Sequence, residues 1–595
     1  MTVTHHPTKT AVLPPNQPHF SPREPVDFAI VGAGAAGGVV ARELARAGFK
    51  VVVLEQGPYL HKEDFRHDEL AITALSALTN DPKSQPNTFR ASEAEEAKVR
   101  PVIQYGRMVG GGSVHFTGNY WRMHEIDFVE RSRKGAIEGT GFTDWPITYA
   151  ELEPYYSRVE WEIGVSGLAG ASPFDPPRSR SYPLPPLPIK PAGVLAERAA
   201  RKLGWHAFPA PMAILSQPYR GRPPCIQCGF CKTFGCEVGA KSSTLAAMFP
   251  DAEATGRCEI RPSSYVRKIE VDRRGRVTGV KYFDAVKREI FQRARAVVVC
   301  ANGAETPRLL LMSRSKLFPD GLANSSGVVG KHLMFNGYAF AGGLFEHRIN
   351  GYRGMVVTRV IHDLYELDPK LDIAGGGGFD FRFDWGPIGF ALDGLPRDAP
   401  NWGPEYKRSL RDYYTRSVYV LAHATQLPVP SNSISLDPKL TDAWGLPAIR
   451  MTFSDHPNDV RLYAYLLDRT LELLDAAGAT RRWAYPLDRV FPEVHLLGTC
   501  RMGNSGKSAT VGQRRRRRPI RRPRAAVSAN LRRSSPTAGR LPGIAGIGQN
   551  AGQLANGWPM AAGPIQAMAA WPRRNRFHEH SAQMRWAAAM VSSGD

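Results

Sequence analysis

Residues 27–57 read DFAIVGAGAAGGVVARELARAGFKVVVLEQG, and this stretch decides the fold of the first domain. Residues 28–31 form a short apolar run without a polar break, which is typical of a strand buried on both faces of a parallel sheet. Apolar residues then recur at helical spacing up to Gly48, and residues 50–54 form a second apolar run. The sequence therefore predicts a strand, a tight turn, a helix and a second strand, as in doubly wound α/β folds.

The predicted turn carries glycines at the spacing G-x-G-x-x-G, formed by Gly32, Gly34 and Gly37, with Ala33 between the first two. In this arrangement one glycine permits the turn, one lets the backbone approach a pyrophosphate, and one lets the helix pack on the strand. The phosphates then face a helix N-terminus. The second strand ends in Glu55, whose carboxylate can hold a ribose hydroxyl pair. An ordinary glycine turn is the alternative, but both strands, the helix and the acid in register favour a dinucleotide site.

The length and composition set bounds on the class of protein. A chain of 595 residues is too long for one small core, so we expect two or more domains. A hydrophobic content of 43% is typical of a soluble globular enzyme, and no apolar run approaches the length of a membrane span. Residues 1–26 are rich in Pro and His and resemble no signal peptide, so we expect a flexible arm. We therefore expect a cytoplasmic protein, or one exported only by co-transport with a partner subunit.

The formal net charge of +22 is concentrated near the end of the chain. Residues 512–595 hold 15 of the 77 Lys and Arg residues but only 2 of the 55 Asp and Glu residues, and residues 514–518 are five consecutive arginines. Such a run can bind nucleic acid or an anionic membrane. A single-base slip in a GC-rich gene would also give Arg, Pro, Ala and Ser from one codon onward. We predict an atypical tail that a shift of reading frame explains better than a binding function, and we expect no nucleic-acid partner.

A second glycine-rich segment, GRMVGGGSVHFTGNYWRM, occupies residues 106–123. Such a run lets the backbone lie directly on a flat ligand. A flexible linker is the alternative, but linkers seldom continue straight into His, Phe, Tyr and Trp. The candidate ligand-binding residues in this segment are Gly106, Val109, Gly111, Gly112, Ser113 and His115.

With these two segments the chain resembles the glucose–methanol–choline (GMC) family of flavin oxidoreductases, whose members carry an FAD fingerprint and a Gly-Gly loop under the flavin. The resemblance continues in DWPITYAELEPYY at 144–156, in ARAVVVCANGAETPRLLLMS at 294–313, and in VHLLGTCRMG at 494–503. The second of these departs from the family at Asn302, where most members have a small residue. The chain is most similar to the large subunits of bacterial FAD-dependent glucose, gluconate and polyol dehydrogenases.

Two further segments extend the resemblance, which covers roughly residues 27–511. Residues 263–284 read as two strands around a turn, and the family position of Val266 touches the adenine half of FAD. Residues 427–454 resemble strands of the family's substrate sheet. Beyond residue 511, neither the family's Asp-Gly contact to FAD nor its second catalytic residue can be found.

The resemblance implies an α/β fold in which a doubly wound FAD-binding domain is interleaved with an α+β substrate domain containing a six-stranded antiparallel sheet. The polar segment between the first βαβ unit and Lys98 is expected to be a helical excursion at the surface. The expected division of the chain is an arm at 1–26, the FAD-binding domain at 27–143 and 256–335, a substrate-domain segment with a cysteine cluster at 144–255, the substrate domain at 336–490, a catalytic segment at 491–511, and the tail at 512–595.

Two histidines stand in family motifs. In the family, the histidine that matches His495 faces the flavin and takes the hydroxyl proton of the substrate while the carbon-bound hydrogen leaves as hydride. Imidazole suits this role because its ordinary pKa is near neutral pH. A core histidine is the alternative. His115 resembles a histidine that is bonded covalently to the flavin in some members, whereas others hold the flavin noncovalently, and the sequence leaves both open.

Four of the seven cysteines lie within 12 residues, as Cys225, Cys228, Cys231 and Cys236. Their spacing, C-x2-C-x2-C-x4-C, is close to the ferredoxin run that holds an iron–sulfur cluster, whereas zinc sites usually separate their cysteine pairs by a longer loop. The segment also resembles the one that holds a three-iron cluster in bacterial FAD-dependent glucose dehydrogenases, where Cys225, Cys231 and Cys236 would be the ligands. Structural thiols or disulfides and a zinc site remain alternatives.

These features predict an FAD-dependent enzyme that oxidises a CH–OH group of a sugar, sugar acid or other alcohol by hydride transfer to the flavin. An iron–sulfur cluster would pass electrons singly to a cytochrome or quinone, with a small subunit as a further candidate partner, and this favours a dehydrogenase. An alcohol oxidase that uses oxygen is one alternative. The other is a catalytically impaired flavoprotein with a basic, anion-binding tail.

Overall fold

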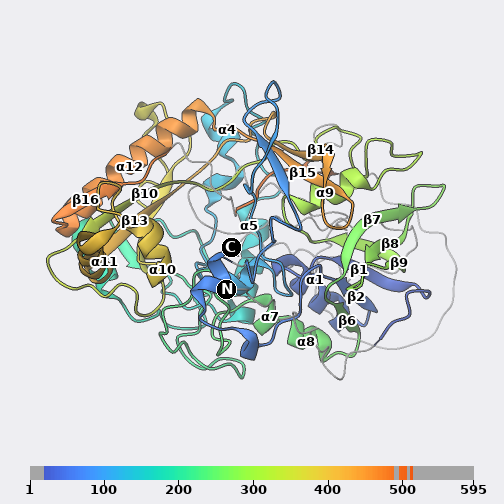
Figure 1. The fold of residues 1–595 in the computed structure, drawn as a ribbon, viewed down its shortest axis with the longest axis horizontal. Coiled ribbons are helices and arrows are strands. Elements are labelled where there is room, and N and C mark those ends of the chain that lie inside the picture. The colour runs from blue at the N-terminus through green and yellow to red at the C-terminus, as the bar shows by residue number, and fades with distance from the viewer. Residues whose placement is uncertain (1–18, 75, 488–494, 505–508, 513–595) are drawn as a thin grey trace, which may run out of the picture.

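The computed structural model describes residues 19–74, 76–487, 495–504 and 509–512. The predicted tail at 512–595, apart from Gly512, and most of the predicted arm at 1–26 therefore lie outside the described residues. The described residues form two six-stranded sheets, one four-stranded sheet and one two-stranded sheet. In Figure 1 the two six-stranded sheets lie toward opposite ends of the long axis, with α12 (Pro457–Ala477) across one of them. None of the described helices is long and apolar enough to cross a bilayer.

The first sheet contains the predicted strand–helix–strand unit. β1 (Val26–Val31) leads through a turn into α1 (Ala35–Arg46), and β2 (Val51–Leu54) pairs with β1 in parallel. Alternate residues of both strands enter two different hydrophobic clusters, so each strand is buried on both faces, as the unbroken apolar runs predicted. The strand order is β6-β2-β1-β9-β8-β7. The other members are β6 (Cys258–Arg261), β7 (Tyr265–Val271), β8 (Val277–Phe283) and β9 (Glu289–Val299).

The four strands β6, β2, β1 and β9 are parallel to one another. β9 and β2 flank β1, and β6 pairs with the other edge of β2. β7 and β8 form the predicted pair of strands around a turn, and they extend the sheet in antiparallel fashion. The chain therefore leaves this sheet after β2 and returns to it about 200 residues later at β6. This interleaving agrees with the fold class that the resemblance implied.

The second sheet is antiparallel throughout, as predicted, with the order β16-β10-β13-β12-β11-β5. Its strands are β5 (Ala207–Pro209), β10 (Gly337–Leu344), β11 (Val357–Ile361), β12 (Gly377–Arg382), β13 (Ser417–Ala424) and β16 (Arg481–Ala484). One face carries small and apolar side chains such as Ala339, Phe379 and Val420, and α6 (Pro191–Leu203) and α12 pack on this face. Since side chains alternate along a strand, the polar residues between them lie on the opposite face.

The four-stranded sheet corrects two predictions. Residues 427–454 do not join the six-stranded substrate sheet; β14 (Ser433–Thr441) and β15 (Pro447–Thr452) pair with each other and with β3 (Asn87–Arg90). The segment before Lys98 contains the short 3₁₀ helix η1 (Lys62–Asp64) and the short helix α2 (Glu69–Ala74). Its β3 pairs in parallel with β15 and antiparallel with β4 (Lys98–Val99). β3 is short and polar, so its strand structure depends on partners that are distant in sequence.

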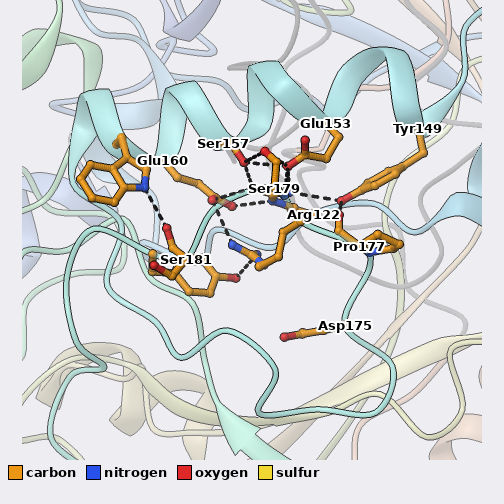
Figure 2. A network of polar contacts seen from close by, with 12 residues as sticks. Arg122, Tyr149, Glu153, Ser157, Glu160, Asp175, Pro177, Ser179 and Ser181 are labelled. Atoms are coloured by element: carbon orange, nitrogen blue, oxygen red, sulfur yellow. Dashed lines mark hydrogen bonds and ion pairs between the residues drawn. The ribbon is translucent and has the colours of Figure 1, made fainter.

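Arg122 forms a buried network of hydrogen bonds with residues of the long helix α5 (Tyr149–Ile163) (Figure 2). Its guanidinium donates to both oxygens of Glu160, at 2.7 and 2.8 Å, and to Glu153 Oε1 at 3.0 Å. The side chains of Arg122 and Glu160 are each 1% exposed. Because all these groups are buried, each charge depends on the others for the interactions that water would otherwise provide.

We expect Arg122→Ala to lower the free energy of unfolding by about 3–5 kcal/mol, because the variant leaves buried carboxylates without their main partner. Arg295→Ala is the control, since Arg295 is 68% exposed in its pair with Asp27 and an exposed pair contributes about 0–1 kcal/mol. Urea unfolding followed by circular dichroism measures both variants. Equal, small effects in the two would show that the buried network does not stabilise the fold.

Candidate active site

A cavity of about 940 Å³ lies between the β1–α1 turn and the second six-stranded sheet. It brings together predicted residues that are hundreds of positions apart in the chain. The predicted site residues that line it are Gly32, Gly34, Glu55, Gly106, Gly111, Gly112, Ser113, His115, Val266 and His495.

The three fingerprint glycines differ in what surrounds them. A Cβ at Gly32 would lie 2.6 Å from the carbonyl oxygen of Cys300, and one at Gly37 would lie 2.0 Å from the carbonyl oxygen of Gly32. Only glycine fits these two positions because backbone atoms occupy the space. A Cβ at Gly34 would meet no protein atom within 4 Å, and Gly34 lines the cavity. The space beside Gly34 is thus open to a ligand.

Glu55 follows β2 directly and is buried beside the turn. Its Oε2 accepts from the backbone nitrogen of Ala33 at 2.9 Å, and its Oε1 accepts from that of Gly57 at 2.9 Å. Burial raises the pKa of the Glu55 carboxyl above its ordinary value, although these two hydrogen bonds act in the opposite direction. The carboxyl therefore both fixes the turn and lines the cavity at its nucleotide end.

The second glycine-rich segment packs directly on the first. A Cβ at Gly111 would lie 2.8 Å from the Cα of Gly34, and the backbone nitrogen of Gly110 donates to Ala33 O at 2.7 Å. Val109 is fully buried and donates its backbone N–H to Pro58 O at 3.0 Å. The glycines of both segments therefore allow two backbone turns to meet at one wall of the cavity.

Ser113 and His115 follow in the short helix α3 (Gly112–His115). Ser113 Oγ donates to Gly110 O at 2.6 Å and accepts from the backbone nitrogen of Thr244 at 3.1 Å, so it fixes the loop. His115 Nε2 is buried and has no hydrogen-bond partner among the described residues. Burial, assisted by the charge of Lys241, lowers the pKa of His115 to about 4. A neutral imidazole with an unsatisfied nitrogen thus lines the cavity.

His495 lines the same cavity. The chain that follows it is anchored where Met334 and Leu497 exchange backbone hydrogen bonds of 3.1 and 2.9 Å. Burial lowers the pKa of His495 to about 3, and the fields of His423 and Arg382 act in the same direction. The imidazole is therefore neutral at neutral pH and can accept a proton.

A polar chain behind His495 was not predicted from the sequence. Arg382 Nε donates to Asp380 Oδ1 at 2.6 Å, and Asp380 Oδ2 lies 2.9 Å from His423 Nε2. His423 Nδ1 lies 3.4 Å from Asn336 Nδ2, and Asn336 lines the cavity. The alternation of polar and aromatic residues in residues 380–385, DFRFDW, is the signal that could have identified this face.

The structure does not support the iron–sulfur prediction. Cys225, Cys228, Cys231 and Cys236 surround one small cavity, and all four are free thiols. However, no group of three or more His, Cys, Asp or Glu side chains in the described part of the chain is arranged to hold a metal ion. Burial raises the pKa of the Cys231 thiol to about 12. The prediction of structural thiols or disulfides at these cysteines stays a prediction.

The cysteine segment nevertheless contacts the wall of the large cavity. Lys241 Nζ donates to the carbonyl oxygens of Phe116, Cys231 and Phe234 at 2.7, 2.6 and 2.9 Å. The backbone nitrogen of Thr233 donates to His115 O at 2.7 Å. These bonds hold Lys232 and Thr233 at the cavity wall.

Comparison with known proteins agrees with this geometry. The N-terminal domain of GMC oxidoreductases matches residues 26–334, and the C-terminal domain matches residues 428–520, slightly beyond the predicted end of the resemblance. The chain is 32% identical to 2-methyl-1,2-propanediol dehydrogenase of Mycolicibacterium austroafricanum over 496 residues, covering 82% of this chain and 87% of that protein. It is 27% identical over 549 residues to the gluconate 2-dehydrogenase flavoprotein of Pantoea cypripedii, with 82% and 86% covered.

The fold is also similar to that of solved structures. A structure of Aspergillus oryzae formate oxidase, from a study of FAD modification, superposes with a TM-score of 0.51 at 16% identity, covering 82% of this chain and 90% of the other. The fold, the two glycine-rich turns and the two matching domains lead to one conclusion. The chain belongs to the GMC oxidoreductase family.

Proposed function

We propose that this chain is an FAD-dependent dehydrogenase that oxidises a CH–OH group of a sugar, sugar acid or other alcohol and passes the electrons to an acceptor other than oxygen. Family membership supports an FAD-dependent oxidoreductase acting on alcohol or sugar substrates. The observation that carries the proposal is that one cavity is lined both by the dinucleotide fingerprint and by a neutral His495.

The described residues fit FAD on three counts. The space beside Gly34 is open, Gly111 brings a second backbone turn against the first, and His115 Nε2 is a buried nitrogen without a partner. Glu55 stands at the nucleotide end, where it would reach a ribose, and Val266 lines the same wall. Bound FAD would supply the acceptor for a hydride from the alcohol carbon. His115 would lie at the flavin whether or not it forms a covalent bond to it.

His495 would act on the substrate hydroxyl. Removal of the hydroxyl proton increases electron density on the carbon that loses hydride, and a positioned base accelerates such a step by about 10²–10⁴-fold. The low pKa keeps the imidazole nitrogen unprotonated, so it is available as an acceptor.

The predicted iron–sulfur cluster was the reason to expect an electron acceptor other than oxygen, and the described residues do not support that cluster. The proposal of a dehydrogenase therefore rests on the related proteins. Two relatives at 32% and 27% identity are dehydrogenases by name, whereas two relatives at 28% identity are oxidases by name. We expect the purified protein to reduce an artificial dye with an alcohol substrate much faster than it releases hydrogen peroxide in air. Peroxide release at the rate of dye reduction would identify an oxidase instead.

The nature of residues 512–595 stays a prediction because they lie outside the described residues, apart from Gly512. Two explanations of this segment can be distinguished by enzyme activity. One is a basic tail on a catalytically impaired flavoprotein, and the other is a shifted reading frame. A protein in which the alternative frame replaces everything after Val511 should be the better enzyme if the frame is shifted. Equal activity of the two proteins would reject the frame shift.

A further inference from the structure

The substrate half of the cavity is formed by one face of the second six-stranded sheet. Tyr338 and Phe340 alternate on β10 with the alanines that contact α12, and Asp380 and Arg382 alternate on β12 with Phe379. Paired residues of neighbouring strands share a face, and Tyr338 pairs with His423. Asn336, Tyr338, Phe340, Arg382, Asp384 and Trp385 line the cavity on this side.

The charges on this face are paired with one another. Asp384 Oδ2 lies 2.8 Å from Lys232 Nζ and accepts from Arg382 Nη1 at 3.3 Å, while Arg382 also pairs with Asp380. Burial alone would raise the pKa of the Asp384 carboxyl, but Lys232 and Arg382 outweigh it and hold that pKa below its ordinary value. The cluster therefore contains two cations and two carboxylates at neutral pH, and it has no net charge.

The rim of the cavity also carries one negative and one positive charge. Among the described residues, Asp393 and Arg397 are the charged side chains that line the cavity from the segment 391–401. Both are exposed. Water screens such exposed charges, so they add little to the selection made deeper in the cavity.

Three buried polar atoms of this face have no hydrogen-bond partner among the described residues: Asp384 Oδ1, Asn336 Oδ1 and Trp385 Nε1. Such atoms are rare in folded proteins because each costs the hydrogen bonds that it made with water. The orientation of the Asn336 amide is fixed by its neighbours. His423 Nε2 donates to Asp380, so His423 Nδ1 accepts from Asn336 Nδ2, and Asn336 Oδ1 is left as an acceptor.

We propose that this face is a subsite for a neutral compound with several hydroxyl groups, with Asp384 Oδ1 and Asn336 Oδ1 accepting from hydroxyls and Trp385 Nε1 donating to one. The inference rests on the proposed function, because it takes His495 as the place where another hydroxyl reacts. A sugar acid would bring an anion to a face whose two cations are already paired. An amino sugar would bring a cation to carboxylates that are already neutralised. Neither charge would be matched, so the subsite selects neutral polyols and sugars.

The first test compares three substrates that share one carbon skeleton: D-glucitol, which is neutral, D-gluconate, which is anionic, and 1-amino-1-deoxy-D-glucitol, which is cationic. Glycerol, glycerate and 3-amino-1,2-propanediol form a shorter set. We expect the wild-type protein to reduce its flavin anaerobically with the neutral member of at least one set, and kcat/KM for that member to be about tenfold or more above those of the charged members.

Two variants shift the charge of the subsite in opposite directions. Asp384→Asn keeps the shape and leaves an excess cation, so kcat/KM for the neutral polyol should fall about tenfold while the preference for the anion over the neutral compound rises about tenfold. Lys232→Met leaves an excess carboxylate, so the preference for the cation should rise. Asp398→Asn is the control, because Asp398 pairs with Arg481 at the surface and does not line the cavity.

The outcomes separate the subsite from the proposed function. If no alcohol reduces the flavin of the wild-type protein, the proposed function fails. If alcohols reduce it but a charged member of a set equals or exceeds the neutral one, the subsite proposal is wrong and the proposed function stands. The subsite proposal is equally wrong if both variants change kcat/KM for all three substrates by the same factor. If Asp384→Asn fails to fold, the comparison of substrates with the wild-type protein and the Lys232→Met variant still test the subsite proposal.

Discussion

Replacing His495 by asparagine is expected to lower the rate of flavin reduction by an alcohol at least about 100-fold while leaving FAD bound. His495 lines the substrate side of the cavity, and its neutral imidazole is positioned to take the hydroxyl proton. Asparagine is polar and fits the space, but it cannot accept a proton near neutral pH. Anaerobic stopped-flow absorbance at the flavin bands measures the rate directly.

The control for this variant is His206→Asn, because His206 is 55% exposed, pairs with Asp363 and does not line the cavity. A wild-type rate in His495→Asn would place the base elsewhere. The pH dependence gives a second check. Since the pKa of His495 is lowered to about 3, the imidazole stays neutral as the pH falls from 8 to 5. Its protonation should therefore produce no acid limb in kcat/KM over that range.

Gly34→Val is expected to abolish FAD binding without unfolding the protein. A Cβ at Gly34 would meet no protein atom within 4 Å, so we expect the protein itself to tolerate the substitution. It would instead fill the space beside the fingerprint turn where a pyrophosphate belongs. Flavin absorbance after gel filtration reports binding, and far-ultraviolet circular dichroism reports the fold.

Gly37→Val is the comparison variant, because Gly37 serves backbone packing whereas Gly34 leaves space for the ligand. A Cβ at Gly37 would lie 2.0 Å from the carbonyl oxygen of Gly32, so this variant should disturb the fold itself. Ala47→Val, at the other end of α1, should change neither property. Stoichiometric flavin in Gly34→Val would mean that the cofactor does not pass this turn.

The parts of the fold that could be predicted are those determined by residues close together in the chain. The strand, glycine turn and helix at residues 26–46 are specified by local periodicity and by glycines that leave no room for a side chain. His495 could be selected because a motif surrounds it, and it lines the same cavity as the fingerprint. That motif could not show that burial would keep the imidazole neutral.

The parts that could not be predicted depend on partners distant in sequence. β3 is polar and becomes a strand only because β15, more than 350 residues later, pairs with it. The spacing of Cys225 to Cys236 predicted an iron–sulfur cluster, but spacing does not determine whether the side chains are arranged to hold a metal ion, and in the described part of the chain they are not. The role of Asn336 depends on His423 and Asp380, which orient its amide and come from strands distant in sequence. Unlike the alternating residues 380–385, a single polar residue such as Asn336 gives no sign in the sequence of the face on which it lies.

The most direct test is anaerobic titration of the purified, unmodified protein with a neutral polyol while the flavin spectrum is recorded. The account predicts bound FAD whose oxidised absorbance bands disappear on addition of the polyol and return on addition of an artificial electron acceptor. Protein that carries no flavin, or a flavin that stays oxidised with every alcohol, would contradict it.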